Sequence, residues 1–207
     1  LQTAGAPVDF GAFPNQQAAG GHRILTLPRS KQRLAMFLDY MASGMGNECR
    51  LWLAGENRAG IKSATTALKQ RFGYTSKLDS AAHCVLFEAS SPLVRQKFRL
   101  AEYRLEWRAE SLPGTPVIHT WPGVFAHGKA DPGSVMLISQ LPGLSTDGSV
   151  LDFGSGCGLI SACFGSMAPE AHFTMTDVDA LAVISSGETM TANGLAATVT
   201  AGDGLAS

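Results

Sequence analysis

The residues with the most evident chemistry form a glycine-rich loop, Gly154 to Gly158, that follows the apolar run Val150 to Phe153. Glycine lets the backbone turn sharply and approach a ligand closely. The helix predicted after Gly158 offers free N–H groups and the positive end of its dipole. The next predicted strand ends at Asp177, whose carboxylate can accept hydrogen bonds from ribose hydroxyls. Together these residues predict a nucleotide-binding site at the carboxyl edge of a parallel sheet.

The spacing of the loop distinguishes two cofactors. Dinucleotide-binding enzymes use G-x-G-x-x-G, whereas this loop reads G-x-G-x-G and is preceded by Asp152. A carboxylate at this position would not help to bind a phosphate group, but it would stabilise the cationic methionine part of S-adenosylmethionine. We therefore expect Asp152, Gly154, Gly156, Gly158 and Asp177 to bind S-adenosylmethionine. NAD is the alternative cofactor, and a glycine turn without a ligand is the purely structural alternative.

Asp203 follows a third predicted strand, in Gly202-Asp203-Gly204. At the next carboxyl end of the sheet it would meet an adenine ring, so it is a candidate partner of the adenine amino group. A polar turn residue would occupy the same place, and both interpretations stay open.

Apolar periodicity places these residues in an α/β fold. Helical spacing of apolar residues alternates with short apolar runs, as in a parallel sheet covered by helices. We expect strands at 23–27, 50–54, 83–89, 103–110, 117–120, 150–154, 172–177 and 197–201, and helices at 30–43, 63–72, 132–141, 158–168 and 179–192.

Charge divides the chain into two halves. Residues 1–112 contain 15 Lys/Arg and 9 Asp/Glu, whereas residues 113–207 contain Lys129 alone against 8 acids. The basic half suits an anionic partner, although the halves could instead neutralise each other. No run reaches the ~18 apolar residues of a membrane span. The four cysteines have no metal-ligand spacing, which predicts reduced thiols in a cytoplasmic protein without a metal.

Several segments resemble the bacterial 16S ribosomal RNA guanine-N2 methyltransferases, which are class I methyltransferases with a Rossmann-like sheet. The segments are Gly55 to Ala64, Trp121 to Phe125, Asp131 to Ser134, and Val150 to Gly158. The glycine loop is common to many methyltransferases, whereas the first three segments are more specific to this family.

The resemblance implies transfer of a methyl group from S-adenosylmethionine to a guanine amine of 16S rRNA in the small ribosomal subunit, and hence a role in rRNA processing. It also implies that Phe125 and Ser134 line the cofactor pocket, and that the protein is a monomer. Family members are duplicated. Residues 1–112 would be the second half of a degenerate, cofactor-free domain, and residues 113–207 the first half of the cofactor-binding domain.

One family motif is missing. The resemblance implies an Asn-Pro-Pro-aromatic segment that holds the amine, and the 207 residues contain none. We expect this catalytic motif to lie beyond Ser207, and therefore assign no catalytic residue within the chain. The expectation is an internal part of a longer enzyme that is inactive by itself. A non-catalytic RNA-binding module of the same fold, or a methyltransferase acting on another amine or amide, are the alternatives.

Overall fold

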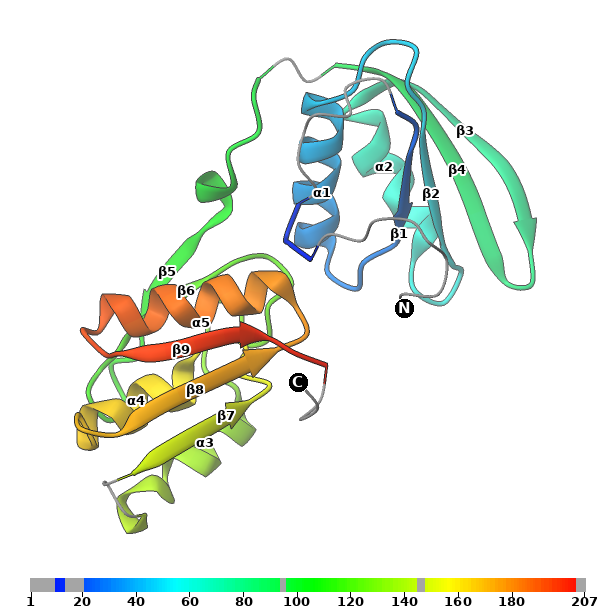
Figure 1. Ribbon diagram of the computed structural model, residues 1–207. Coiled ribbons are helices and arrows are strands. Elements are labelled where there is room, and N and C mark those ends of the chain that lie inside the picture. The colour runs from blue at the N-terminus through cyan, green and yellow to red at the C-terminus, as the bar shows by residue number, and fades with distance from the viewer. Residues whose placement is uncertain (1–9, 14–20, 94–95, 145–147, 204–207) are drawn as a thin grey trace. The chain divides into compact units, whose positions relative to one another are not determined.

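The computed structural model describes residues 10–13, 21–93, 96–144 and 148–203, which form two compact units (Figure 1). The N-terminal unit contains the described residues between 15 and 103. The C-terminal unit contains residues from 104 onward together with 10–13. The sequence places a boundary at residues 112–113, which lie within the C-terminal unit. The assignment of residues 1–112 and 113–207 to a degenerate and a cofactor-binding domain stays a proposal.

Ser207, beyond which the sequence analysis places the catalytic motif, lies outside the described residues. The structure therefore does not test the position of that motif, and its placement beyond Ser207 stays a prediction.

The N-terminal unit is built on a four-stranded mixed sheet with the order β1-β2-β4-β3. Strands β1 and β2 are parallel, and the other neighbours are antiparallel. The strands are β1 (Arg23–Thr26), β2 (Leu51–Glu56), β3 (Phe72–Ala81) and β4 (Cys84–Pro92). The expected strand at 83–89 is thus confirmed as β4 and β2 matches the expected 50–54, but β3 was not expected.

Helix α1 (Lys31–Ser43) forms where apolar periodicity predicts it. The Ser30 hydroxyl accepts a hydrogen bond from the Arg33 amide at 3.2 Å and so caps the first turn. Leu34, Leu38 and Ala42 follow one another at intervals of one turn and are buried against the sheet. This packing fixes the core of the unit.

The expected second helix of the N-terminal unit was wrong in its length. The helix expected over 63–72 is shorter: a 3-10 turn, η1 (Ile61–Ser63), precedes α2 (Ala64–Lys69), and Phe72 already pairs with β4. The Ser63 hydroxyl donates to the Gly60 carbonyl rather than capping α2.

The hairpin between β3 and β4 explains why β3 was missed. Its two turn residues, Ala82 and His83, both have positive φ, 47° and 64°. Two-residue hairpins require this conformation and usually use Asn or Gly for it. Because Ala-His carries no such signal, the turn could not be recognised from the sequence.

The described residues of the segment from Leu93 to Tyr103 contain no strand. Lys97 and Arg99 lie in irregular structure, not on a strand, and Arg95 lies outside the described residues. The 3-10 turn η2 (Leu100–Tyr103) ends the unit, where the Tyr103 hydroxyl donates to the Asp39 carboxylate at 2.7 Å. Residues 1–9 and 14–20 lie outside the described residues.

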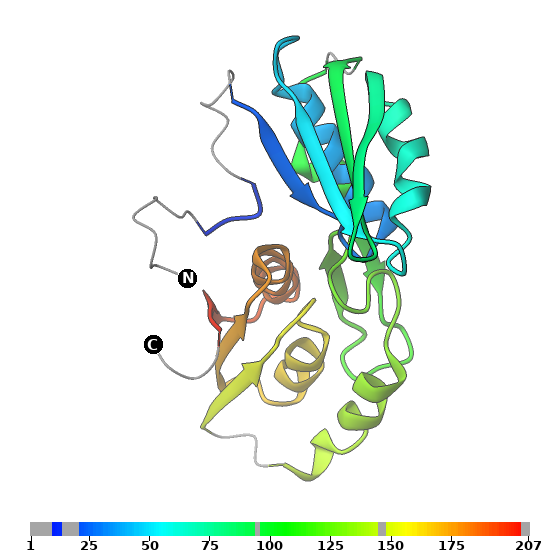
Figure 2. The ribbon, with the colours of Figure 1, turned by 90° about the vertical axis from the view of Figure 1, so that its right-hand side faces the viewer.

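The C-terminal unit contains a three-stranded parallel sheet with the order β7-β8-β9. Helices α4 and α5 lie next to each other on one face of this sheet (Figure 2). The elements are β7 (Ser149–Phe153), α4 (Leu159–Met167), β8 (His172–Asp177), α5 (Ala180–Ala192) and β9 (Ala197–Ala201). The expected alternation of strands and helices is confirmed here.

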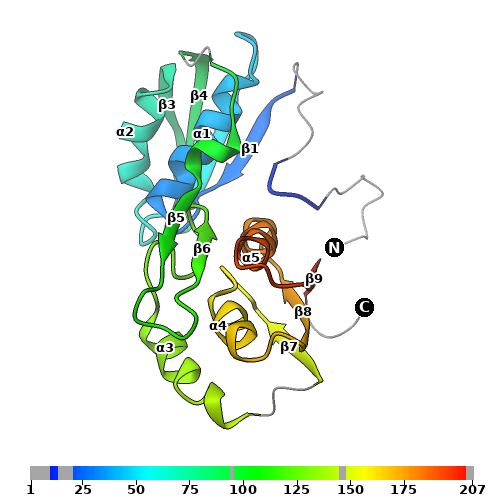
Figure 3. The same ribbon diagram turned by 90° about the vertical axis from the view of Figure 1, so that its left-hand side faces the viewer.

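An antiparallel hairpin, β5 (Leu105–Arg108) and β6 (Val117–Thr120), begins the C-terminal unit and lies beside α5 (Figure 3). Helix α3 (Pro132–Ile138) follows, with Pro132 at its first turn and the Asp131 carboxylate accepting from the Ser134 amide at 3.1 Å. A 3-10 turn, η3 (Leu141–Gly143), leads toward β7. The helix expected over 132–141 therefore ends three residues early.

Candidate functional site

The glycine loop joins β7 to α4 at the carboxyl edge of the parallel sheet. Gly154, Gly156 and Gly158 have φ of 77°, 54° and 75°, in the left-handed region that favours glycine. The amides of Gly154 and Ser155 both donate to the Thr176 carbonyl, at 2.8 and 3.0 Å. These bonds hold the loop against the end of β8. The sequence-based expectation of a tight turn at this position is confirmed.

Asp177 clamps the loop from the neighbouring strand. One carboxylate oxygen accepts a hydrogen bond from the Gly156 amide at 3.0 Å, and the other accepts from the Asp179 amide at 2.9 Å. A carboxylate has about four acceptor positions. Two therefore remain for a ligand, so the structural role of Asp177 is compatible with binding ribose hydroxyls.

Asp152 lies on β7 and is half-buried. Its carboxylate accepts a hydrogen bond from the Ser161 hydroxyl at 2.6 Å. Burial raises the pKa of Asp152 above its ordinary value, the Ser161 hydrogen bond lowers it, and the negative charge of Asp177 raises it again. A cation placed beside Asp152 would offset this unfavourable burial of charge, which is the property that a sulfonium or ammonium ligand requires.

Phe125 and Ser134 lie where the glycine loop can share a ligand with them. A cavity of about 100 Å³ is bounded by both residues and by Gly154, Ser155 and Gly156. Phe125 is 65% exposed, and a Cβ placed on Gly156 would lie 3.8 Å from the Phe125 Cβ. The structure therefore brings together residues that are roughly twenty to thirty positions apart in the sequence.

Sequence reasoning missed Ser155. Its side chain is only 8% exposed, and its hydroxyl has no hydrogen-bond partner among the described residues. Buried hydroxyls in folded proteins are usually paired. An unpaired hydroxyl at the wall of this cavity is compatible with a polar ligand group there. The signal that could have found it is its place between two glycines.

Asp203 follows β9 and is exposed. With Val178, Ala201 and Gly202 it borders a hollow of about 600 Å³ that also includes Phe10. The Gly202 amide donates to the Asp177 carbonyl at 3.1 Å, which ties this hollow to the end of β8. Val178 and Phe10 are 61% and 60% exposed. Their apolar surfaces beside Asp203 suit a flat ring, and neither was predicted from the sequence.

Asp152 borders a different cavity from Asp203. It contributes, with Leu137 and Phe153, to a hollow of about 360 Å³ between α3, β7 and α4. Gly154 lines both this hollow and the smaller cavity beside Phe125. Asp152, Asp177 and Asp203 thus lie at or near the carboxyl ends of β7, β8 and β9, in the order of the strands in the sheet, as an elongated ligand requires.

Within the described residues, no cluster of His, Cys, Asp and Glu side chains could hold a metal ion. No helix in that part of the chain is long and apolar enough to cross a membrane.

Two family profiles match the chain. "Methyltransferase small domain N-terminal" matches residues 1–107, and "Methyltransferase small domain" matches residues 116–207. The chain belongs to the family of methyltransferases with this small domain. The curated relatives of this family include small-subunit ribosomal RNA methyltransferase C of two species. That of Pseudomonas putida is 42% identical over 88% of this chain and 54% of the relative. That of Aliivibrio salmonicida is 34% identical over 94% of this chain and 56% of the relative.

This family member therefore spans about half the length of the curated relatives that it matches. A solved structure is also similar: the 16S rRNA N2 G1207 methyltransferase of T. thermophilus, in complex with AdoMet and guanosine. The TM-score is 0.75 at 22% sequence identity, over 86% of this chain and 49% of that one. The likeness confirms the class I methyltransferase fold that the sequence predicted.

Proposed function

We propose that this chain is the S-adenosylmethionine-binding part of an enzyme that methylates the N2 amine of a guanine in 16S rRNA of the small ribosomal subunit. The observation that carries the proposal is the clamp between Asp177 and the Gly156 amide. It holds a glycine loop open at the carboxyl edge of a parallel sheet. The curated relatives bear the name of that activity, and their rRNA substrate is proposed here for this protein.

The residues present fit the cofactor. A Cβ at Gly154 would meet nothing within 4 Å, so the loop leaves open space on its outer side. The unpaired Ser155 hydroxyl, the spare acceptor positions of Asp177 and the buried charge of Asp152 are complementary to an amino-acid group, a ribose and a cation respectively. NAD carries no sulfonium for Asp152 to stabilise, which favours S-adenosylmethionine.

Each candidate residue has a separate binding role in this proposal. Gly154 and Gly156 allow the backbone to approach the ligand, and Gly158 allows the loop to pack closely against Ser186 of α5. Asp152 faces its cationic end, while Phe125 and Ser134 close the cavity above the loop. Asp177 accepts from the ribose, and Asp203 accepts from the adenine amino group. When bound, S-adenosylmethionine supplies an electrophilic methyl group for transfer to nitrogen. We assign no residue of this chain to holding the guanine amine.

The N-terminal half is the proposed RNA-holding part. Several of its cations are exposed and have no ion-pair partner among the described residues: Arg29, Lys31, Arg58, Lys62, Lys69 and Lys97. In contrast, Arg50 and Arg71 are paired with Glu88 and Asp39 at 3.2 and 2.7 Å. The unpaired charges remain available to phosphates. We place the protein in the cytoplasm, where its proposed rRNA substrate resides, and expect it to act as a monomer.

Calorimetry on the intact protein tests the cofactor assignment. We expect S-adenosylmethionine to bind and NAD not to bind. Removal of a charge-assisted ribose contact in Asp177→Ala costs ~1.5–3 kcal/mol, so the Kd should rise by roughly one to two decades. Asp79→Ala, at an exposed acid of the N-terminal unit, is the matched control.

Radiolabelled methyl transfer by the intact enzyme that contains this chain, to small subunits or 16S rRNA, followed by nucleoside analysis, tests the substrate. N2-methylguanosine is the expected product. NAD affinity equal to that of S-adenosylmethionine, or a methylated product other than a guanine amine, would contradict the proposal.

A further inference from the structure

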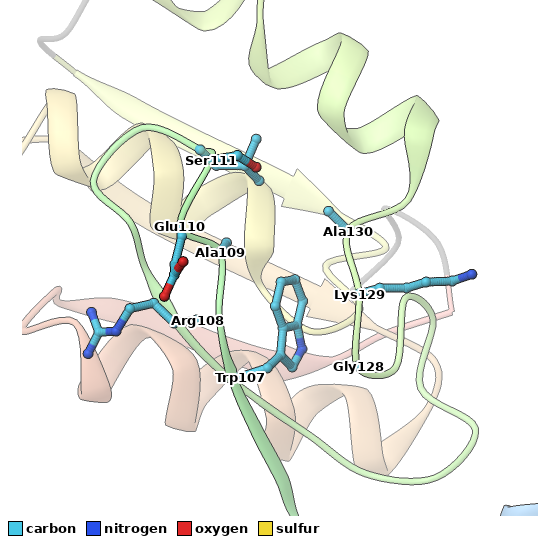
Figure 4. A pocket seen from close by; sticks show the side chains of 9 residues that line it. Trp107, Arg108, Ala109, Glu110, Ser111, Gly128, Lys129 and Ala130 are labelled. Carbon is cyan, nitrogen blue, oxygen red and sulfur yellow. The ribbon is translucent and has the colours of Figure 1, made fainter.

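A separate pocket of the C-terminal unit has no role in the cofactor site. Its volume is about 420 Å³, and it shares no lining residue with the three cavities along the sheet edge. Two segments form it: Trp107 to Leu112, which continues from β5, and Gly128 to Ala130, which precedes α3 (Figure 4).

The side chain of Trp107 extends from the first segment toward the second, and its ring offers an aromatic surface (Figure 4). The residue is partly exposed. Its indole nitrogen is buried and has no hydrogen-bond acceptor among the described residues. Buried donors without an acceptor are uncommon. The indole ring therefore lines the pocket, while its N–H group makes no hydrogen bond to the described residues.

Two cations flank the indole. Arg108 and Lys129 are both exposed, and Figure 4 shows their side chains extending away from Trp107 on opposite sides. Lys129 is the only Lys or Arg between residues 113 and 207. Neither cation has an ion-pair partner among the described residues, although one Arg108 N–H donates to the Thr115 carbonyl at 3.2 Å. An acidic half of the chain thus presents its single cation beside an aromatic ring and an arginine.

We propose that this pocket binds a single-stranded stretch of RNA, with a base or ribose against the Trp107 ring and a phosphate near each of Arg108 and Lys129. Aromatic side chains that alternate with cations are the usual platform for single-stranded nucleic acid. One small anion cannot meet two cations that point in opposite directions, whereas successive phosphates of a strand lie on both sides of a stacked nucleotide. The choice of RNA as the ligand rests on the proposed function. The geometry of the pocket is observed independently of that function.

Glu110 also borders the pocket and is exposed. Its charge opposes phosphate, but Figure 4 shows it on the Arg108 side of the indole, away from Lys129. Because the indole nitrogen is buried, stacking and phosphate contacts carry the proposal.

The test is fluorescence anisotropy of a labelled, mixed-sequence single-stranded RNA of about 12 nucleotides, titrated with the intact protein at several salt concentrations. We expect the double variant Arg108→Gln/Lys129→Gln to bind about five- to tenfold more weakly at moderate salt, and the salt slope to fall by about 1.4, the value for two lost phosphate contacts on a single strand.

A control separates the pocket from general charge. Gln140→Glu/His172→Glu changes the net charge of the same unit by the same amount, at two exposed residues that border none of these hollows. Its affinity should fall much less, and its salt slope should stay unchanged. Equal losses in the two double variants would overturn the proposal, because they would show a nonspecific effect of charge.

Two variants test the ring itself. Trp107→Ala should weaken RNA binding about fivefold or more, and Trp107→Phe should restore most of it because the aromatic face is kept. Where Trp107→Ala lowers the melting temperature, Trp107→Phe and the surface double variant still decide the question. Wild-type affinity in both Arg108→Gln/Lys129→Gln and Trp107→Ala would show that the pocket does not contact RNA.

Failure here is distinguishable from failure of the proposed function. If the pocket binds RNA but the intact protein takes up no S-adenosylmethionine, the function is wrong and the pocket assignment stands. If methylation of 16S rRNA proceeds with an unchanged KM in the pocket variants, the function stands and this pocket assignment is wrong.

Discussion

The Asn193 side chain forms a two-way hydrogen-bonded contact with the backbone of Val117. Its amide oxygen accepts from the Val117 N–H at 2.9 Å, and its amide nitrogen donates to the Val117 carbonyl at 2.7 Å. Asn193 follows the last residue of α5, and Val117 begins β6. On its other edge β6 pairs with β5, so the helix end takes the place of a second neighbouring strand.

Two hydroxyls of α5 extend this contact along β6. The Ser185 hydroxyl donates to the His119 carbonyl, and the Thr189 hydroxyl accepts from the His119 amide at 3.1 Å. Ser185 and Thr189 are fully buried. The polar face of α5 therefore satisfies a strand edge that would otherwise be buried without partners, and it fixes the hairpin from which Trp107 projects.

Asn193→Ala should destabilise the C-terminal unit by about 1–3 kcal/mol, since it leaves the N–H and carbonyl of Val117 without partners. Urea unfolding measures the loss, and hydrogen exchange should show reduced protection of the Val117 amide. Asn57→Ala, at an exposed loop residue, is the control. An unchanged exchange rate at Val117 would mean that water replaces the side chain without cost.

Gly158→Ala and Gly154→Ala should differ, although both glycines have positive φ, 75° and 77°. A Cβ at Gly158 would lie 3.1 Å from the Ser186 Cα and 3.3 Å from the Met175 Cε, whereas a Cβ at Gly154 would meet nothing within 4 Å. Gly154→Ala should therefore cost only the left-handed strain, ~1–2 kcal/mol. Gly158→Ala adds crowding, for a total of roughly 2–4 kcal/mol. Equal melting temperatures of the two variants would contradict the inference that Gly158 packs closely against Ser186 of α5.

The Asp152 carboxylate should lower the stability of the cofactor-free protein in a pH-dependent way. Because burial raises its pKa above the ordinary value of 3.8, folding favours its protonated form. Its ionisation then lowers the stability as the pH rises from below 3.8 through its folded pKa. Asp152→Asn keeps an oxygen that can accept from Ser161 and removes the charge.

The melting temperature of Asp152→Asn should therefore gain on that of the wild type as the pH is raised from about 3 toward about 7, in the absence of cofactor. The same variant should bind S-adenosylmethionine more weakly, because a cation loses its partner. A constant difference in melting temperature across this pH range would show that the Asp152 carboxylate is not penalised by folding.

Thiol chemistry should distinguish the cysteines. Cys84 is exposed, whereas Cys49, Cys157 and Cys163 are buried. Burial raises the pKa of Cys157 to about 11 and that of Cys163 to about 12, so neither forms the reactive thiolate near neutral pH. An alkylating reagent should modify Cys84 first in the native protein, as mass spectrometry of peptides would show. Early modification of Cys157 would indicate that the glycine loop opens.

Charge reversal of Arg95, Lys97 and Arg99 tests the proposed RNA-holding half. RNA affinity and its salt dependence should fall, while S-adenosylmethionine binding stays intact. The pair between Arg99 and Glu102 is exposed on both sides, at 73% and 60%, so its loss should cost little stability. An unchanged RNA affinity with a lowered melting temperature would instead show that these cations stabilise the folded protein and do not bind RNA.

The sequence by itself determined the elements of the C-terminal unit and the residues of the glycine loop. Local signals were sufficient there: the apolar runs of β7 and β8, the glycines with positive φ, and an acid at the end of each strand. Such features depend on neighbours within a few positions, and periodicity records them directly.

Only the tertiary structure decided what lies beside the loop. The contact of Asn193 with Val117 joins segments far apart in the chain, and the burial of the unpaired Ser155 hydroxyl depends on the surrounding fold, so no local pattern encodes either feature. The same holds for the pocket between Trp107 and Lys129, whose segments are brought together by the fold. The β3–β4 hairpin was missed for a related reason. The backbone of Ala82 and His83 is held in a rare conformation by the pairing of the two strands, not by the preference of those residues.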